Sequence, residues 1–418
     1  MKRSVSFLLV IVMLFAFASC GGKDGEVTGE AKPGDVPVTP AKTDNALLFE
    51  KNITVTTGRE AAVKFYGGKD GINKIGVTVS GYDEIKHDIS EASEKVLGRA
   101  ENAVSDDPEY RFFEADINFD GYQDFAIQSW KKDGDTVPYY CWFWSTLENS
   151  YVFGTALESP VLDKANSKIY CDVTDDGEEY INVYAVSNGS VVLQRSQSVT
   201  AAPTFLNDLS AFEQYMAPAD RDAYLILANK QTELGEDYIP ENLVDIANTR
   251  QDGRATAQMV ECAARALEAL YIDMYSAGYT DVSVTSAYRS YDDQKYIFDG
   301  FLNQNLAEGY DYDTALAMVL SDTAAPGTSE HQTGLCCDMH SSPSADAART
   351  EFPKTPAFKW LTENAWKYGF ILRYPEDKVD ITGYTYESWH YRFVGRYHAA
   401  KIHAMGLCLE EYLQLINK

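Results

Sequence analysis

The stretch "PGTSEHQTGLCCDMH", residues 326–340, decides how the C-terminal half of this chain is interpreted. It contains His331, a turn at Gly334 and a short apolar segment that leads to Asp338. The apolar segment predicts a strand, and the turn before it lets the chain double back. The side chains of His331 and Asp338 can then face one cation, and both are residue types that bind zinc. The stretch therefore predicts two protein ligands of a metal site.

A second segment, "ESWH" at residues 387–390, supplies what such a site still needs. A catalytic zinc typically takes three protein ligands and keeps a fourth position for water, and His390 completes that count. Glu387 lies three residues before His390 and is not needed as a ligand. It is suited to act as a general base that takes a proton from the attacking water and passes it to the leaving amine.

A third segment, "SAYRSYDDQ" at residues 286–294, offers Arg289 and Gln294. Hydrolysis of an amide needs a group that stabilises the developing oxyanion or anchors the terminal carboxylate of the substrate. An arginine at the end of a strand can do either, because its guanidinium presents a fixed fork of donors. The three segments together predict a metal-dependent hydrolase.

In this order and spacing, the three segments resemble the D-alanyl-D-alanine carboxypeptidases of the VanY type. These form the zinc D,D-/L,D-carboxypeptidase branch of the peptidase M15 family and are related to the LAS metallopeptidases. The resemblance covers about residues 222–415 and implies an α+β zinc peptidase domain of LAS or Hedgehog-like fold over residues 215–418. It implies zinc ligands at His331, Asp338 and His390, a catalytic glutamate at Glu387, a transition-state arginine at Arg289, and substrate contacts at Ser329 and Gln294.

The sequence departs from this family at "LCCD", where Leu-Ala and a β-branched residue commonly precede the aspartate. Side chains alternate along a strand, so Cys336 should point the same way as Asp338 and Cys337 the opposite way. A thiolate could compete for zinc, but three harder ligands already complete the catalytic count. We therefore expect Cys337 in the core and Cys336 at the edge of the site, with neither acting as a ligand.

The first residues read as an export signal. Lys2 and Arg3 precede an uncharged stretch, residues 4–19, which ends directly before Cys20. Small residues before that cysteine resemble a bacterial lipobox, although Phe17 departs from the usual aliphatic residue. We predict a lipoprotein signal peptide over 1–20 with a lipidated Cys20, and a polar tether over 21–45. An uncleaved signal anchor is the alternative, but the apolar run is shorter than the roughly 20 residues of a spanning helix.

Residues 46–205 have the composition of a β-rich domain. Segments such as "NITVTT", "YYCWFW" and "YINVYAV" are rich in β-branched and aromatic residues, and turn-forming residues such as "SNGS" separate several of them. They predict an antiparallel domain of unknown role, with one helix near residues 89–103.

The segment "DINFDGYQD" within this region has the pattern of a calcium loop. Asp116, Asn118, Asp120 and Asp124 offer alternate oxygen ligands, and Gly121 permits the sharp turn that gathers them. The alternative is a hairpin with an Asp-Gly turn and acidic residues that face solvent. The sequence leaves both interpretations open.

From about residue 215 onward the pattern changes to helices with a few strands. Residues 254–279 place Met259, Ala263, Leu270 and Met274 on one helical face, and Gly278 gives a stop signal. Strands are expected at "VSVTSAY", "GLCCDM" and "ESWHYRFVG", and helices near 292–307, 312–320 and 355–368.

Composition limits the range of partners. The formal net charge of −27 repels phosphate backbones, so the chain is not expected to bind nucleic acid. Contact with a membrane is expected through the N-terminal lipid anchor. Six cysteines remain after Cys20, and in an exported chain they permit disulfides without fixing their pairing.

The resemblance implies removal of the C-terminal D-alanine from peptidoglycan stem peptides at the cell envelope, with D,D- and L,D-specificity both open. A D-Ala-D-Ala dipeptidase and a peptidoglycan endopeptidase are alternatives within the same chemistry. A non-catalytic lipoprotein that binds the cell wall is the alternative of another class. The presence of Glu387 argues against it, because a binding protein has no use for a general base beside the metal.

Overall fold

The computed structural model describes residues 46–68, 71–88, 112–128 and 138–416. The predicted signal peptide, the lipidated Cys20, the tether and the helix near 89–103 lie outside these residues. Within the described part of the chain, no helix has the length and apolar character needed to cross a membrane.

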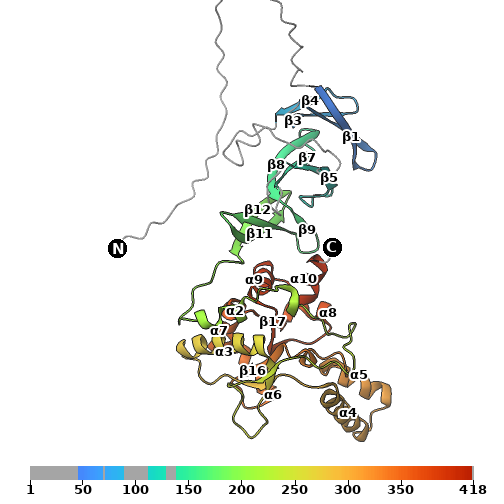
Figure 1. Cartoon of the computed structure of the whole chain (residues 1–418). Coiled ribbons are helices and arrows are strands. Elements are labelled where there is room, and N and C mark those ends of the chain that lie inside the picture. The colour runs from blue at the N-terminus through green and yellow to red at the C-terminus, as the bar shows by residue number, and fades with distance from the viewer. Residues whose placement is uncertain (1–45, 69–70, 89–111, 129–137, 417–418) are drawn as a thin grey trace, which may run out of the picture. The chain divides into compact units, whose positions relative to one another are not determined.

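The N-terminal region consists of antiparallel sheets, as the sequence predicts (Figure 1). It holds three four-stranded sheets, in each of which every strand pairs with its neighbour in sequence. The first contains β1 (Ala46–Thr56), β2 (Arg59–Gly68), β3 (Gly71–Val79) and β4 (Ile85–Asp88). The second contains β5 (Phe112–Ala115), β6 (Asp124–Gln128), β7 (Pro138–Ser145) and β8 (Ser150–Glu158). The third contains β9 (Val161–Asp163), β10 (Lys168–Asp175), β11 (Glu178–Ser187) and β12 (Ser190–Ser198).

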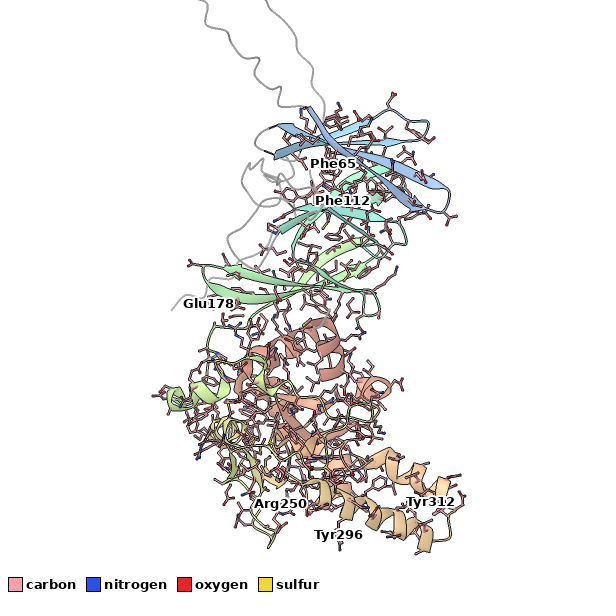
Figure 2. The ribbon with its side chains drawn as sticks, turned by 45° about the vertical axis from the view of Figure 1, so that its right-hand side comes forward. Phe65, Phe112, Glu178, Arg250, Tyr296 and Tyr312 are labelled. Carbon is pink, nitrogen blue, oxygen red and sulfur yellow. The ribbon has the colours of Figure 1, made fainter. Side chains whose placement is uncertain are left out.

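Aromatic residues form the core between the first two sheets. Phe65 of β2 meets Phe112 of β5 edge to face, with 5.7 Å between the ring centroids (Figure 2). Phe125 and Trp142 are buried in the same cluster and stack at 6.2 Å. The aromatic richness of this region is therefore used for packing, since large rings bury much apolar surface.

The predicted calcium loop is the hairpin that joins β5 to β6. Asp124 is fully buried, and its carboxylate accepts hydrogen bonds from the backbone N–H groups of Ile117, Asn118 and Trp144, at 2.9, 3.2 and 2.8 Å. These three bonds satisfy Asp124 within the protein.

The other acidic side chains of this hairpin also have partners. Asp116 accepts from the backbone N–H of Gly121 and pairs with the ammonium group of Lys164. Asp120 accepts from the N–H of Tyr122 at 2.9 Å. This geometry matches the hairpin alternative, and calcium binding at Asp116, Asn118, Asp120 and Asp124 stays a prediction.

The C-terminal region has the α+β layout that the sequence predicts, around a sheet in the order β15-β16-β18-β17. The sheet contains β15 (Ser283–Ser286), β16 (Cys336–His340), β17 (Phe370–Tyr374) and β18 (Glu387–Phe393), and β13 (Leu243–Asp245) pairs with β14 (Gln258–Val260). The helices are α2 (Glu213–Met216), α3 (Glu261–Ser276), α4 (Tyr291–Ala307), α5 (Tyr312–Asp322), α6 (Ala345–Thr350), α7 (Pro356–Asn364), α8 (Val379–Thr382), α9 (Arg396–Met405) and α10 (Leu409–Ile416). Short 3₁₀ turns include η3 (Glu330–Thr333), which precedes β16.

One expectation about this region is wrong. Helix α3 begins at Glu261, and Met259 lies instead in β14, where it pairs with Val244 of β13. Val260, the last residue of β14, has φ of −54° and ψ of 135°, which are not helical, so the helix begins only at Glu261. Met259 is still fully buried, so the apolar face continues across the boundary between the two elements.

The cysteines of the described residues form no disulfide. Cys336 and Cys337 are both fully buried, and Cys337 belongs to the main apolar cluster of the C-terminal region, as strand alternation predicts.

Candidate active site

The central strands of the C-terminal sheet bring the predicted ligands together. Asp338 on β16 lies opposite His390 on β18, and Ser286 of β15 pairs with Asp338 on the other side. Residues that are directly opposite in an antiparallel pair project from the same face of the sheet. His331 comes from η3, which ends at Gly334 in the left-handed conformation with φ of 66°.

The three side chains converge at close range. Asp338 Oδ2 lies 3.4 Å from His331 Nε2, and Asp338 Oδ1 lies 3.1 Å from His390 Nδ1. Both histidines are buried, with 5% and 3% of their surface exposed. Asp338 Oδ1 is buried and accepts no hydrogen bond of acceptable geometry from the described residues. Lone pairs that meet in this way without a donor between them suit a shared cation.

Each imidazole is oriented by a contact at its other nitrogen. His331 Nδ1 lies 2.6 Å from the carbonyl oxygen of Ala287, and His390 Nε2 lies 3.3 Å from a carboxylate oxygen of Glu330. Because both partners are acceptors, we assign the ring protons to these two nitrogens. His331 Nε2 and His390 Nδ1 then carry the lone pairs that face Asp338, as metal ligands must.

The electrostatics of the site favour a positive charge. Burial alone would lower the pKa of both histidines, but the neighbouring Cys336 and Asp338 raise it. Despite burial, the two imidazoles hold the pKa of Asp338 well below its usual range. Two neutral nitrogens and one carboxylate are a typical donor set for a catalytic zinc ion, so the residues fit Zn²⁺.

Cys336 reaches the same place. Its sulfur and one ring nitrogen of each histidine, His331 and His390, all lie within 4.8 Å of one another. The thiol therefore borders the ligand set, on the side of the strand that alternation predicts. That Cys336 is not a ligand stays a prediction.

Glu387 lies beside the ligands at the start of β18. Its Oε2 is 3.5 Å from His390 Nδ1, and the side chain is mostly buried. Burial raises the pKa of Glu387 to about 7. A carboxylate with this pKa can both accept and release a proton near neutral pH, as a general base must.

All seven predicted site residues line one cavity of about 220 Å³. The Nε atom of Arg289 is buried and has no hydrogen-bond partner among the described residues. Gln294 donates to the carbonyl of Ala324 at 2.6 Å, while its own carbonyl oxygen is buried without a partner. Ser329 is also buried in the wall of the cavity. Arg289, Gln294 and Ser329 therefore place hydrogen-bonding side chains in the wall of the cavity.

Sequence reasoning missed three charged residues that line the cavity, Asp322, Glu330 and Arg349. Arg349 of α6 lies 5.4 Å over the ring of Trp389 and 3.8 Å from Asp322 of α5, and no local pattern connects these segments. Glu330 is the neighbour of His331, but its partners Arg373 and Arg392 come from β17 and β18, and no local pattern connects them.

Two imidazoles and a carboxylate around one point, a buried carboxyl group beside them and an arginine on the same cavity define a metal-dependent peptide hydrolase. Comparison with known proteins agrees. Residues 256–396 match the family described as VanY, D-alanyl-D-alanine carboxypeptidase. The putative carboxypeptidase YodJ of Bacillus subtilis is 36% identical over 216 residues, which cover 51% of this chain and 76% of that protein. The chain therefore belongs to the VanY family of carboxypeptidases, and it is a peptidase.

A second curated relative matches a smaller share of its own length. A D-alanyl-D-alanine carboxypeptidase of Enterococcus faecalis is 39% identical over 130 residues, or 31% of this chain and 46% of that protein. Among solved structures, an LdcB LD-carboxypeptidase is 36% identical, covering 47% of this chain and 88% of the other, with a TM-score of 0.41. A variant of a VanY D,D-pentapeptidase in complex with Zn(II) is 37% identical, covering 46% and 98%, with a TM-score of 0.38.

Proposed function

We propose that this protein is a zinc D,D- or L,D-carboxypeptidase that removes the C-terminal D-alanine of peptidoglycan stem peptides. The observation that carries the proposal is the placement of the ligand set, Glu387 and Arg289 around one cavity. The family assignment supports the same reaction.

The chain positions each part of the reaction. Zn²⁺ held by His331 Nε2, Asp338 and His390 Nδ1 would polarise the scissile carbonyl and make water a better nucleophile. Glu387 takes the proton of that water and delivers it to the amine of the departing D-alanine. Burial raises the pKa of the Glu387 carboxyl group to about 7. This is close to the pKa of a water molecule bound to a catalytic zinc ion, so the proton passes easily between them.

Arg289, Gln294 and Ser329 hold the peptide. The guanidinium of Arg289 can bind the terminal carboxylate of the substrate or the oxyanion that develops during attack. The unpartnered amide oxygen of Gln294 can accept a hydrogen bond from a peptide N–H. These contacts orient the scissile bond toward Glu387.

Mass spectrometry tests this function directly. The purified full chain is incubated with Zn²⁺ and either a pentapeptide or a tetrapeptide muropeptide. Loss of one D-alanine from the pentapeptide supports D,D-specificity, and loss from the tetrapeptide alone supports L,D-specificity. Release of the dipeptide D-Ala-D-Ala, or cleavage of a cross-link, would instead identify the dipeptidase or the endopeptidase.

The control variants separate catalysis from binding. Glu387→Gln should bind Zn²⁺ but cleave no peptide at an appreciable rate, while Glu363→Gln on the exposed face of α7 should behave as the wild type. Absence of cleavage by the wild type, with peptide still bound, would favour the wall-binding lipoprotein.

We further propose that the chain is a lipoprotein of the cell envelope, anchored through Cys20, and that its peptidase domain has the LAS or Hedgehog-like fold. The basic residues, the apolar run and the lipobox-like residues before Cys20 support the anchor. The wild type should incorporate a labelled fatty acid, and Cys20→Ser should not. A wild type that takes up no label and keeps residues 1–19 would indicate an uncleaved signal anchor.

A further inference from the structure

A buried network of charges lies behind the ligand His390. Glu330 Oε1 accepts from Arg373 Nε at 2.7 Å and from Arg392 Nη1 at 2.6 Å, while Glu330 Oε2 lies 3.3 Å from His390 Nε2. The side chains of Glu330, Arg373 and Arg392 are completely buried. A carboxylate so deep in the protein is stable as an anion only when cations and donors surround it.

The network continues to the last helix of the chain. The terminal nitrogens of Arg373 make a bidentate pair with Glu410 of α10, at 2.8 and 2.6 Å. Arg392 also donates from Nη2 to the backbone carbonyls of Tyr224 and Ile226, at 2.9 and 2.7 Å, and from Nε to that of Phe393, at 3.0 Å. Each arginine is therefore held from two sides, and the geometry of Glu330 is fixed in turn.

The charges of this network balance. Two carboxylates, Glu330 and Glu410, face two guanidinium groups, so the network is neutral and His390 can be neutral as well. Glu330 Oε1 accepts from both guanidinium groups, so the carboxyl group acts as an acceptor, and His390 donates to its other oxygen through Nε2. This leaves the lone pair of Nδ1 directed at Asp338.

We propose that Glu330 is a positioning residue that fixes the orientation and tautomer of His390 for metal binding. Glu410 supports it in turn, because it holds Arg373, which donates to Glu330. The C-terminal helix α10 then supports the metal site, although none of its residues lines the cavity. The inference rests on the proposed zinc site but not on the identity of the substrate.

Loss of Glu410 has a definite expected consequence. In Glu410→Gln the network gains one positive charge, and Arg373 keeps Glu330 as its sole carboxylate partner among the contacts described above. The guanidinium should then draw Glu330 more strongly and weaken its hydrogen bond with His390. The added positive charge and the weaker hydrogen bond between Glu330 and His390 both disfavour a cation between His331, Asp338 and His390.

Glu411 provides a matched control on the same helix. It pairs with Lys378 at 3.0 Å and accepts from the N–H of Cys408 at 2.8 Å, so it also anchors α10 through an ion pair. Its side chain is 16% exposed, close to the 13% of Glu410. Glu411→Gln therefore weakens the docking of α10 without removing a partner of Arg373.

The test measures zinc affinity by competition with a chromogenic chelator, together with the visible spectrum of the Co²⁺-loaded protein. We expect Glu330→Gln to lower zinc affinity by about 10- to 100-fold, as loss of an outer partner of a ligand typically does. Glu410→Gln should lower it on the order of 3- to 10-fold, a smaller loss because it lies one contact further away. Both variants should alter the Co²⁺ spectrum, and Glu411→Gln should change neither quantity.

Two results would overturn the inference. Glu410→Gln could bind Zn²⁺ as tightly as the wild type, or Glu411→Gln could lose the same affinity, which would reduce the network to the docking of a helix. If Glu330→Gln fails to fold, the comparison of the two α10 variants still decides. No substrate is used, so a failure of the proposed peptide cleavage is recognised separately.

Discussion

Two acidic loops of this protein look alike in sequence and differ in chemistry. Residues 116–124 lead to Asp124 at the start of β6, and residues 326–338 lead to Asp338 within β16. Asp124 accepts three backbone hydrogen bonds, two from its own loop and one from the neighbouring strand β7. Asp338 faces two imidazole nitrogens instead, and its Oδ1 accepts no hydrogen bond from the described residues.

The difference shows what marks a metal site. A buried carboxylate is costly unless its oxygens are satisfied, and the first loop satisfies Asp124 with its own backbone and that of β7. In the second loop, the carboxylate oxygens of Asp338 face the ring nitrogens of His331 and His390 instead of backbone donors. A cation can bind between these three side chains. The number of acidic residues does not separate the two loops, because the first loop holds more of them. The two loops differ instead in whether the carboxylate oxygens of the buried aspartate have hydrogen-bond donors.

Replacement of each aspartate in turn tests most directly whether only Asp338 belongs to a metal site. Asp338→Asn should lose carboxypeptidase activity by more than the roughly 10²- to 10⁴-fold that a missing general base costs, because it removes an anionic ligand. It should also lose zinc affinity. Peptide release and chelator competition measure the two losses. Asp124→Asn is the matched control and should keep both, so an equal loss in that variant would contradict the distinction.

Glu387→Gln tests whether Glu387, which lies beside the ligands of the second loop, acts as a general base or as a metal ligand. We expect kcat to fall by about 10²- to 10⁴-fold, since the amide cannot take a proton from water. Zinc affinity should stay close to that of the wild type, because Glu387 is not counted among the ligands. Loss of bound zinc, measured by elemental analysis, would make Glu387 a ligand and refute its assignment as the base.

The sequence predicts the second loop better than its surroundings, for a physical reason. His331, Asp338, His390, Glu387 and Arg289 lie in three short segments, and turn and strand patterns within each segment predict how its side chains point. The structure brings these side chains together on one cavity.

The network behind His390 had no such signal. Glu330, Arg373 and Glu410 come from η3, β17 and α10, and only the folded sheet places them in contact. Helical periodicity also misassigned Met259, because β14 has three residues and is too short to show a strand pattern of its own. Apolar spacing therefore predicts the buried face but not the boundary between the two elements.

The stability of the first loop should depend on pH in a direction that its geometry dictates. Burial raises the pKa of Asp124 to about 7, above the roughly 3.9 of an exposed aspartate. The folded state then binds the proton more tightly than the unfolded state. Its contribution to stability is complete below about pH 4 and is lost as the pH rises through about 7.

Unfolding in urea, followed by tryptophan fluorescence, measures this dependence, because Trp142 and Trp144 lie in the adjoining strand. We expect the midpoint to fall between pH 5 and pH 8 in the wild type and to change less in Asp124→Asn. That variant should itself be about 1–3 kcal/mol less stable, since backbone donors lose their acceptor. A rise of the midpoint with millimolar Ca²⁺, absent in Asp124→Asn, would support the calcium prediction instead.

Cys336→Ala should have the smallest effect. If Asp338, His331 and His390 bind the cation without the sulfur, the thiol of Cys336 is only a small apolar group at the edge of the site. Activity should then stay within about twofold, and stability should fall by roughly 1 kcal/mol or less for the atom removed. Zinc affinity and the Co²⁺ spectrum should not change.

The Co²⁺ spectrum makes this last prediction decisive. A thiolate bound to Co²⁺ gives an intense charge-transfer band in the near ultraviolet that imidazole and carboxylate do not give. If the wild type shows this band and Cys336→Ala loses both the band and zinc affinity, the sulfur is a ligand. The second loop would then contribute three donors rather than two, and the position two residues before Asp338, where the family commonly has alanine, would change the character of the metal site.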